Sequence, residues 1–308
     1  MRLFYLLPAL LIIVLNCSSS HADYDFDFDT DIEGGEFLRL ETDVDNDLDL
    51  TRIRISESGG EIVFLIEEYA GNVLVDSDVR DFDLDSFDYV VVVSGQNCRL
   101  DLESSAALTA IIAAGGDQND RIRGIHYALG YGGNDDLFDS KTGRGGLGND
   151  LIAGCLNAWG EEGDDVIHAA NFSEAPFVRA GPGNDWVIGS SRADSLYGGP
   201  GDDVIIGGPG RDTIWGGGGF DTLYGGDGDD IMNGGDGVET PAEAGEILNG
   251  QAGADTFYQW TVNGNPIETW DDFRAHEGDR YQQKTWNSFA PWQFYYPGAG
   301  GFSSGGIK

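Results

Sequence analysis

The chain has 308 residues, with 54 Asp and Glu against 17 Lys and Arg, a formal net charge of -37, and 48 glycines. This charge excludes a nucleic-acid-binding protein, because affinity for a phosphate backbone comes mainly from Lys and Arg. A hydrophobic share of 40% and a charged share of 23% exclude a disordered polyelectrolyte, so a folded core is expected. Because so many carboxylates repel one another in a compact state, the sequence predicts that cations neutralise them.

Residues 1–22 are typical of a secretory signal peptide. Arg2 precedes an apolar run that is shorter than the roughly 20 apolar residues needed to span a bilayer. The small residues Ser20 and Ala22 predict cleavage after Ala22, and therefore a secreted protein. Cys17 leaves lipid anchoring open as the alternative. No later segment is apolar enough to predict a transmembrane span.

Residues 23–84 are expected to form an N-terminal β cap. Acidic and apolar residues alternate over residues 23–32, which indicates an edge or capping strand, and charge on such a strand discourages edge pairing. Residues 51–55 and 61–68, joined by a Ser-Gly-Gly segment, predict a β-hairpin, and residues 89–93 predict a buried strand.

A nine-residue pattern dominates the second half of the chain. Four tandem copies, GGPGDDVII, GGPGRDTIW, GGGGFDTLY and GGDGDDIMN, occupy residues 198–233 and fit G-G-x-G-x-D-x-U-x, in which U is apolar. Imperfect copies extend this register over residues 180–237, and the pattern returns at residues 250–258. A related signature recurs upstream every 15 residues, at Asp120, Asp135, Asp150 and Asp165.

The residue two positions after each acid is apolar in all of these repeats. This rule predicts a short strand that buries its middle side chain, and a flexible glycine-rich linker would not follow it. Stacked repeats would then build a continuous core. The predicted core residues are Ile122, Leu137, Ile152, Ile167, Val187, Leu196, Ile205, Ile214, Leu223, Met232, Leu248 and Phe257.

The residue types of the repeat favour calcium. Glycines allow positive φ angles and close approach, so a six-residue loop can aim its carbonyl oxygens inward, and the Asp adds a carboxylate. Calcium prefers six to eight oxygen ligands, carboxylates and carbonyls together, and tolerates irregular geometry. Successive loops are therefore candidate calcium sites.

The nonapeptides resemble those of the repeats-in-toxin (RTX, or hemolysin-type) family of secreted calcium-binding proteins. The resemblance is strong over residues 115–258. It implies an all-β fold, a right-handed parallel β-roll or β-helix solenoid, which we place at residues 85–258. Two nonapeptides would make one 18-residue turn, with calcium held between the loops of successive turns.

The resemblance also implies which residues bind the ions. On one side the bridging residues would be Asp194, Asp212 and Asp230, and on the other Asp185, Asp203 and Asp221. Carbonyl groups would come from Gly199, Gly201, Gly208, Gly210, Gly217, Gly219, Gly226 and Gly228. The 15-residue spacing departs from both 9 and 18, so wider coils with fewer ions are expected at Asp120, Asp135, Asp150 and Asp165.

Residues 259–308 are rich in Trp and Tyr and are expected to form a C-terminal cap over the open end of the roll. Residues 272–279 are similar to the segment that closes many such arrays. Family members exported in one step carry a C-terminal signal and no N-terminal one, and the reverse arrangement here predicts a two-step route. The sequence leaves open whether Cys98 and Cys155 form a disulfide or are separate buried thiols.

Catalysis has little support in the sequence. There is no H-E-x-x-H zinc motif, and the G-x-S-x-G match at residues 301–305 has no strand before it or helix after it. His126 and His168 are expected at surface or loop positions, without a third ligand for zinc. A non-enzymatic protein is therefore predicted.

Aromatic residues at position nine of the repeat are expected to point outward. Tyr197 and Trp215 are 18 residues apart, so they would stack on one face, with Tyr224 on the other. Such a strip could bind a polysaccharide or protein, or could only cover the strands. The sequence thus predicts a secreted calcium-binding protein with calcium-coupled folding and an extracellular structural or binding role; the alternative is a carbohydrate-active enzyme or carbohydrate-binding module on the same solenoid.

Overall fold

The computed structural model describes residues 24–30, 36–42, 50–58, 60–70, 73–83, 89–94, 99–105, 110–170, 174–235, 246–262, 265–266, 268–270 and 280–285. These residues contain strands and no helix, and so no helix in these ranges could cross a membrane. Five sequence predictions lie outside them: the signal peptide, lipid anchoring at Cys17, Cys98 as a disulfide partner, the closing segment 272–279 and the motif at 301–305.

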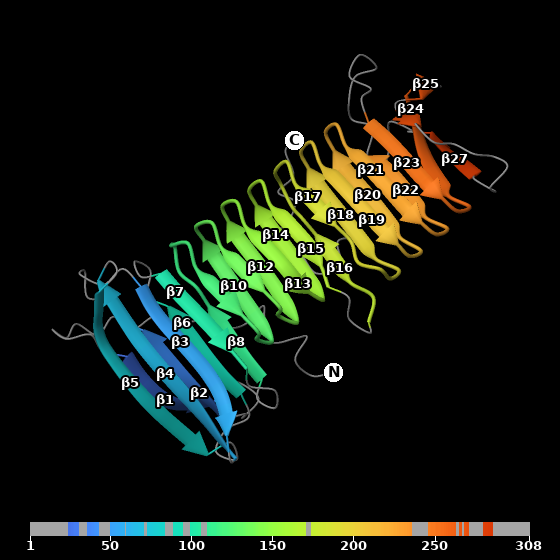
Figure 1. Cartoon of the computed structure of the whole chain (residues 1–308). Coiled ribbons are helices and arrows are strands. Elements are labelled where there is room, and N and C mark those ends of the chain that lie inside the picture. The colour runs from blue at the N-terminus through green and yellow to red at the C-terminus, as the bar shows by residue number, and fades with distance from the viewer. Residues whose placement is uncertain are drawn as a thin grey trace. The chain divides into compact units, whose positions relative to one another are not determined.

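The described strands form two sheets (Figure 1). Sheet A has, in spatial order, β1 (Tyr24–Thr30), β2 (Glu36–Thr42), β6 (Tyr89–Ser94), β8 (Ala110–Ala114), β10 (Tyr127–Gly132), β12 (Thr142–Leu147), β14 (Asn157–Glu162), β16 (Phe177–Arg179), β18 (Ser195–Pro200), β20 (Thr213–Gly218), β22 (Ile231–Gly235), β24 (Thr256–Val262) and β25 (Asn265–Pro266), and β27 (Arg280–Thr285) also pairs with β24. Sheet B has β26 (Glu268–Trp270), β23 (Glu246–Ala252), β21 (Thr222–Asp227), β19 (Val204–Pro209), β17 (Trp186–Ile188), β15 (Val166–Ala169), β13 (Leu151–Cys155), β11 (Asp136–Phe138), β9 (Arg121–Arg123), β7 (Arg99–Ser104), β3 (Leu50–Ser58), β4 (Glu61–Ala70) and β5 (Val73–Asp83).

The chain alternates between the two sheets from β6 to β24, and over this range each strand pairs in parallel with the next strand of its own sheet. Leu196 of β18 is in register with Ile214 of β20, and Ile205 of β19 with Leu223 of β21. The result is a parallel β-solenoid of about 8 turns, which confirms the predicted all-β fold class.

The N-terminal strands continue both sheets. The predicted hairpin is confirmed as β3 and β4, which are antiparallel from the pair Leu50↔Tyr69 to the pair Ser58↔Glu61. The alternating segment forms β1, which lies at the end of sheet A as an edge strand. Strands β2 and β3 run parallel to β6 and β7, and the predicted buried strand is confirmed in β6.

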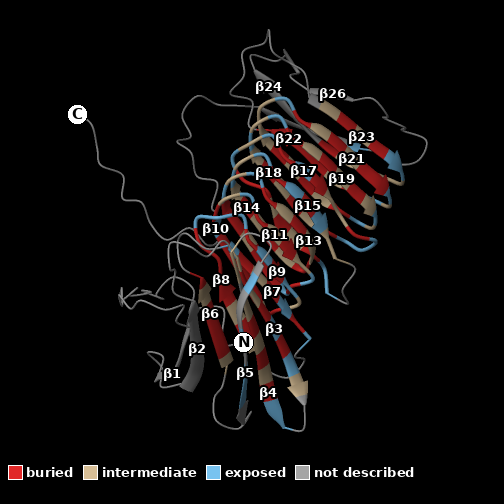
Figure 2. Ribbon diagram, turned by 60° about the vertical axis from the view of Figure 1, so that its left-hand side comes forward, coloured by how far each residue is buried: buried red, intermediate tan, exposed pale blue. Residues whose placement is uncertain are grey.

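The core lies between the two sheets. Figure 2 shows the buried positions as a band that runs through the strands, while exposed positions concentrate in the loops. All twelve predicted core residues, from Ile122 to Phe257, have a relative exposure of 0%. The regular burial of one side chain in each short strand explains why a chain with so much glycine still has a continuous core.

The coils between β9 and β14 are three residues shorter than the 18-residue coils, so the predicted wider coils are wrong. Tyr127 is in register with Thr142, whereas Tyr197 is in register with Trp215. The difference lies in the connection that leads into sheet A. A three-residue connector, such as residues 124–126 or 139–141, replaces the six-residue loop of the repeat, such as residues 207–212, whose first three residues still pair as the end of β19. The loops that lead into sheet B keep six residues in both regions.

The shorter coils enclose smaller side chains. The inward-facing residues of sheet A are Ala128, Gly143 and Ala158 in the 15-residue coils, and Leu196, Ile214 and Met232 in the 18-residue coils. The middle residue of these connectors is also buried, as for Ile125 and Ser140, and so is Cys155, which takes the equivalent place at the end of β13. A Cβ on Gly143 would lie 3.0 Å from Cys155 Sγ, so glycine makes room for this thiol.

Candidate functional site

Buried aspartates form two columns, one along each edge of the solenoid. Each aspartate ends a six-residue loop and directly precedes a strand. Column B, which precedes strands of sheet B, consists of Asp120, Asp135, Asp150, Asp165, Asp185, Asp203 and Asp221. Column A, which precedes strands of sheet A, consists of Asp194, Asp212, Asp230 and Asp255. Every one of these residues is at most 2% exposed, which is unusual for an acidic side chain.

Each column is a ladder of hydrogen bonds between carboxylates and backbone. The N–H of Asp185 donates to Asp203 Oδ1 at 2.9 Å, and the N–H of Asp203 donates to Asp221 Oδ1 at 2.9 Å. In column A the N–H of Asp194 donates to Asp212 Oδ1 at 2.9 Å. One carboxylate oxygen of each rung is therefore satisfied by the neighbouring coil.

The second carboxylate oxygen, Oδ2, has no hydrogen-bond partner among the described residues at most positions of both columns, whereas Oδ2 of Asp120 accepts the N–H of Gly116 and that of Asp194 accepts the N–H of Ser190. An ionised carboxylate with an unsatisfied oxygen is costly to bury, so each such atom needs a proton or a cation. The orphaned atoms include Oδ2 of Asp135, Asp150, Asp165, Asp185, Asp203, Asp212 and Asp230.

Position one is glycine in every loop except the one that ends at Asp185, where it is Ala180, and in the glycine loops Oδ2 fills the space beside it. A Cβ on Gly198 would collide with Oδ2 of Asp203 and would lie 2.5 Å from the carbonyl oxygen of Gly216 in the next coil. A Cβ on Gly216 would collide in the same way with Oδ2 of Asp221. A carboxylate oxygen and a backbone carbonyl oxygen therefore lie on either side of one small volume.

Positions two and four bring further carbonyl oxygens to the loops. Gly217 and Gly219 have φ angles of 133° and 124°, in the left-handed region that favours glycine. A Cβ on either would collide with the carbonyl oxygen of Gly199 or Gly201 in the preceding coil. The same stacking holds along column A, where Gly208 and Gly210 lie against Gly226 and Gly228.

Burial raises the pKa of the column aspartates. The pKa of Asp203 rises to about 8, because of burial first and then the charges of Asp221 and Asp185, while the N–H of Asp185 opposes the shift. Burial likewise raises the pKa of Asp135 and Asp165 to about 8, and that of Asp212 to about 7. Without a cation these groups therefore favour their protonated form.

The donor set fits calcium. No point in the described ranges gathers three Asp, Glu, His or Cys side chains, so a cation would be held by carboxylates of successive coils together with backbone carbonyls. Oxygen donors of these two kinds are those that calcium prefers. The columns offer neither the thiolate nor the imidazole ligands that zinc usually takes.

The structure brings the predicted site residues together in the two groups that the sequence suggested, and it adds one residue to them. Asp194, Asp212 and Asp230 lie in column A, and Asp185, Asp203 and Asp221 in column B. The added residue is Asp255, whose Oδ1 accepts the N–H of Asp230 at 2.9 Å. The repeat at residues 250–258 was the signal for it.

A second ladder at position five was missed. The side-chain Oδ1 of this residue accepts the N–H of its counterpart in the next coil, as between Asn119 and Asn134 at 2.8 Å and between Asn184 and Asp202 at 2.8 Å. The signal was the recurrence of Asn or Asp directly before the column aspartate. The side chains that accept these bonds on the edge of column B belong to Asn119, Asn134, Asn149, Asp164, Asn184 and Asp202.

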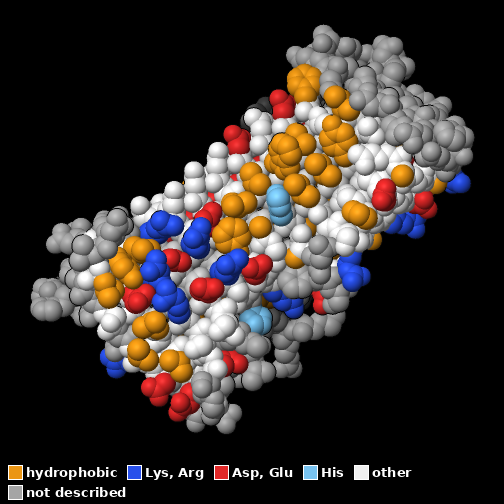
Figure 3. All heavy atoms as spheres, in the orientation of Figure 1, with side chains coloured by type: hydrophobic (Ala, Val, Ile, Leu, Met, Phe, Trp, Pro, Cys, Tyr) orange, Lys and Arg blue, Asp and Glu red, His pale blue; other side chains and the backbone are white. Residues whose placement is uncertain are grey.

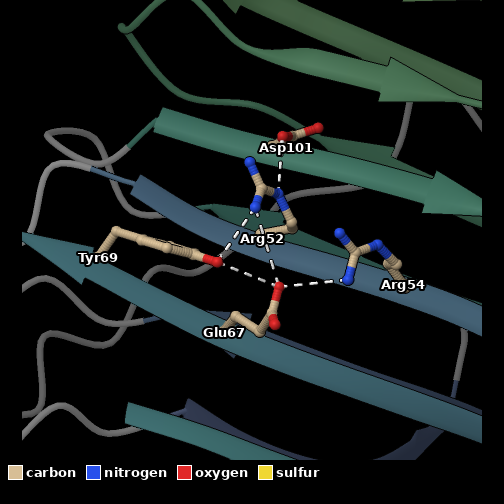
Figure 4. A network of polar contacts seen from close by, with 5 residues as sticks. All are labelled: Arg52, Arg54, Glu67, Tyr69 and Asp101. Atoms are coloured by element: carbon tan, nitrogen blue, oxygen red, sulfur yellow. Dashed lines mark hydrogen bonds and ion pairs between the residues drawn. The ribbon is translucent and has the colours of Figure 1, made fainter. Parts of the chain in front are cut away.

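A polar network on the outer face of sheet B joins the N-terminal strands to the solenoid (Figure 4). Arg52 Nε donates to Asp101 Oδ2 at 3.0 Å, and its guanidinium lies 5.0 Å from the centre of the Tyr69 ring. Arg54 donates to Glu67 at 3.2 Å. Figure 3 shows basic and acidic side chains side by side over this end of the face, and hydrophobic side chains gathered over strands farther along. These contacts connect β3, β4 and β7.

An aromatic ladder crosses the outer face of sheet A. The ring centroids of Trp159 and Phe177 are 5.9 Å apart, those of Phe177 and Tyr197 5.5 Å, and those of Tyr197 and Trp215 5.9 Å. The predicted stacking of Tyr197 on Trp215 is therefore confirmed. Tyr224 lies on β21 of sheet B, as expected.

The remaining candidate residues lie apart from both columns. His168 is exposed on β15, and His126 is half-buried, with its Nδ1 accepting the N–H of Ile111 at 3.4 Å. Cys155 is a buried free thiol, and burial raises its pKa to about 11. A buried thiol with such a pKa is a poor nucleophile.

Comparison with known families agrees with this geometry. Residues 179–214 and 206–238 match the RTX calcium-binding nonapeptide repeat, in 4 copies. No curated protein matches the chain. The family match covers the 18-residue coils and not the 15-residue coils.

Proposed function

We propose that this chain, which carries RTX calcium-binding repeats in residues 179–238, is a secreted protein that folds as its aspartate columns bind calcium. Outside the cell it would have a structural or binding role and no catalytic one. The observation that carries the proposal is the row of buried Oδ2 atoms, such as those of Asp185, Asp203 and Asp212, that have no hydrogen-bond partner in the part of the chain that the structure describes. Each is an anionic ligand directed into a loop that also contains backbone carbonyls.

Folding and ion binding would form one equilibrium. Without a cation, stacked carboxylates repel one another, and strands with a single buried side chain each cannot hold the coils together. Asp203 and Asp221 would hold an ion on the edge of column B, and Asp212 and Asp230 on the edge of column A. The ion would supply the positive charge that lets these residues stay ionised while buried.

The calcium affinity expected of such a site indicates that the protein folds outside the cell. Extracellular calcium modules bind with a Kd of about 10⁻⁴ to 10⁻³ M. Sites of this affinity stay empty at cytosolic calcium levels and fill outside the cell. A signal peptide at residues 1–22, as the sequence predicts, would deliver the chain unfolded to the place where it folds.

A calcium titration of residues 23–308 tests the proposal. Far-UV circular dichroism and binding calorimetry would be followed from chelator into millimolar calcium. We expect a cooperative gain of β signal with calcium that magnesium does not reproduce, because Mg²⁺ demands a tighter octahedral shell. A chain that is already folded in chelator and takes up no calcium would contradict the proposal.

A carbohydrate-binding module is the second candidate, because four aromatic rings form a continuous strip on sheet A. Flat aromatic surfaces suit the apolar faces of sugar rings. The test is binding to insoluble polysaccharides in calcium, with Trp215→Ala compared with Trp186→Ala on sheet B. A loss of about tenfold or more in affinity for the first variant alone would favour this function, since a stacked ring contributes about 1 kcal/mol or more. Equal binding by both variants would exclude the strip as the sugar site.

A further inference from the structure

We propose that column B binds calcium in the 15-residue coils as well, at Asp135, Asp150 and Asp165, upstream of the residues that match the repeat family. These coils would carry one row of ions, whereas the 18-residue coils carry two. The inference rests on the proposed function, because it assumes that the columns are calcium sites. It concerns the number and place of the ions.

The ladder of column B runs through both regions without a break. The N–H of Asp120 donates to Asp135 Oδ1 at 2.7 Å, and the N–H of Asp150 donates to Asp165 Oδ1 at 2.8 Å. The ladder also crosses the junction between the regions, where the N–H of Asp165 donates to Asp185 Oδ1 at 2.7 Å although the two residues are 20 apart in sequence. Changes in coil length are therefore absorbed elsewhere in the coil.

The carboxylates of the short coils have the same unsatisfied atom as those of the long coils. Oδ2 of Asp135, Asp150 and Asp165 has no hydrogen-bond partner among the described residues, and these side chains are at most 2% exposed. The space beside each Oδ2 is closed in the same way. A Cβ on Gly145 or Gly160 would collide with the Oδ2 of its loop, and would lie 2.7 Å or 2.6 Å from a carbonyl oxygen of the next coil.

The remaining carbonyl donors are also in place. Gly148 and Gly163 have φ angles of 117° and 139°, and a Cβ on either would collide with a carbonyl oxygen of the preceding coil. At position two, Tyr131 and Glu161 replace glycine and still adopt φ angles of 75° and 79°. The loop conformation is thus kept where the sequence pattern weakens, which explains why the sequence match ends earlier than the geometry.

The opposite edge of the short coils cannot provide a second row. Its connectors have three residues and no buried aspartate. Asp139 is the acidic residue of connector 139–141, and it is exposed and paired with Arg123 at 3.0 Å. Each 15-residue coil therefore offers one candidate site.

Counting bound calcium in the mature full-length protein tests the inference. Equilibrium dialysis in millimolar calcium, followed by elemental analysis, gives the number of ions per chain. In Asp150→Asn with Asp165→Asn, each amide oxygen can still accept the ladder hydrogen bond, while the anionic ligand is lost. We expect at least two ions fewer, because Asp150 and Asp165 border three successive gaps between loops, from Asp135 to Asp185, and both carboxylates of the middle gap are lost. The β signal in calcium should remain.

A matched control removes the same charge from the same coils. Asp136 and Asp139 lie on the surface and pair with Arg121 and Arg123. The variant Asp136→Asn with Asp139→Asn should bind as many ions as the wild type. If the Asp150 and Asp165 variant does not fold, the single variant Asp150→Asn should still show at least one ion fewer, because Asp150 borders the two gaps shared with Asp135 and Asp165.

The outcomes separate the two proposals. A wild-type chain that binds calcium, together with an unchanged ion count in the Asp150 and Asp165 variant, overturns this inference and leaves the proposed function standing. If the control variant Asp136→Asn with Asp139→Asn loses as many ions as the Asp150 and Asp165 variant, this inference is likewise overturned and the proposed function stands. A wild-type chain that binds no calcium overturns the proposed function, and this inference with it.

Discussion

The 15-residue and 18-residue coils differ on one edge of the solenoid and agree on the other. Both have a six-residue loop before each sheet B strand, ending in a buried aspartate of column B. Only the 18-residue coils have a second such loop, with an aspartate of column A, before each sheet A strand. The unit of this fold is therefore the half coil, and one half can be shortened while the register of the other is preserved.

The core adapts to the shorter half. In the 15-residue coils a buried connector residue such as Cys155 packs against Gly143, whereas in the 18-residue coils a large residue such as Ile214 fills the space. The shorter connection is thus accompanied by smaller inward-facing side chains in sheet A. The two regions thus both have a buried core, although their inward-facing side chains differ in volume. Both keep the hydrogen-bond ladder of column B.

The largest expected effect comes from removing two neighbouring carboxylates of an 18-residue region. Asp203→Asn with Asp221→Asn should weaken calcium-induced folding by about 2.7 kcal/mol for each lost site at calcium levels near 100 times Kd. The pair Asp117→Asn with Asp227→Asn removes the same charge from exposed positions outside the columns and should change stability by less than about 0.5 kcal/mol. Urea unfolding in calcium measures both, and equal losses would refute the assignment of column B.

A smaller effect is expected from filling the space at position one. Gly216→Ala and Gly160→Ala each place a Cβ against the Oδ2 of a column aspartate and a carbonyl of the next coil. Each should lower the free energy of unfolding by about 1 to 3 kcal/mol, in the long and the short coils alike. Gly218→Ala is the matched control, because a Cβ there meets nothing within 4 Å. If thermal unfolding shows that Gly218→Ala destabilises the protein as much as the other two substitutions, the loop geometry is contradicted.

The ion-free protein should become more stable as the pH falls. Burial raises the pKa of Asp135, Asp165 and Asp203 to about 8, well above their value of 3.8 in the unfolded chain. The folded state then binds more protons than the unfolded state between these values, so stability falls as the pH rises from about 4 to about 8. In calcium the trend should reverse, because protons compete with the ion. Far-UV circular dichroism in chelator at pH 5.5 and 8 would measure the folded fraction without the ion, and urea midpoints in calcium at the same two pH values would measure stability with it. Signals and midpoints that do not change with pH would contradict both trends.

The smallest effect concerns the loops where glycine is missing. Tyr131 holds a φ of 75° and is half-exposed, so its ring adds little packing. Tyr131→Gly should stabilise the calcium-bound protein by about 1 kcal/mol, since a left-handed conformation costs a residue with a Cβ about that much. Tyr127→Gly, in the same strand β10 but at a buried position, should instead destabilise it. A melting temperature that falls for Tyr131→Gly would show that this side chain has a packing role.

The sequence predicted the periodic parts of the molecule well. The spacing of Asp203, Asp212 and Asp221 defined two columns, and the apolar residue two positions after each acid defined the core. It could not predict the size of the 15-residue coils, because connectors such as residues 124–126 carry no glycine and aspartate signature. The role of Asn134 and its counterparts was hidden as well, because an exposed amide next to an acid has no hydrophobic period and becomes visible only when coils are stacked.

Hydrogen exchange of the two regions, in calcium and in chelator, tests the central claim most directly. On removal of calcium, backbone amides in residues 195–235, which lie between two columns, should exchange about 100-fold faster or more. Amides in residues 121–169, which lie beside one column, should lose less protection. Protection that is equal in the two solutions, or that is lost mainly from residues 121–169, would contradict the account.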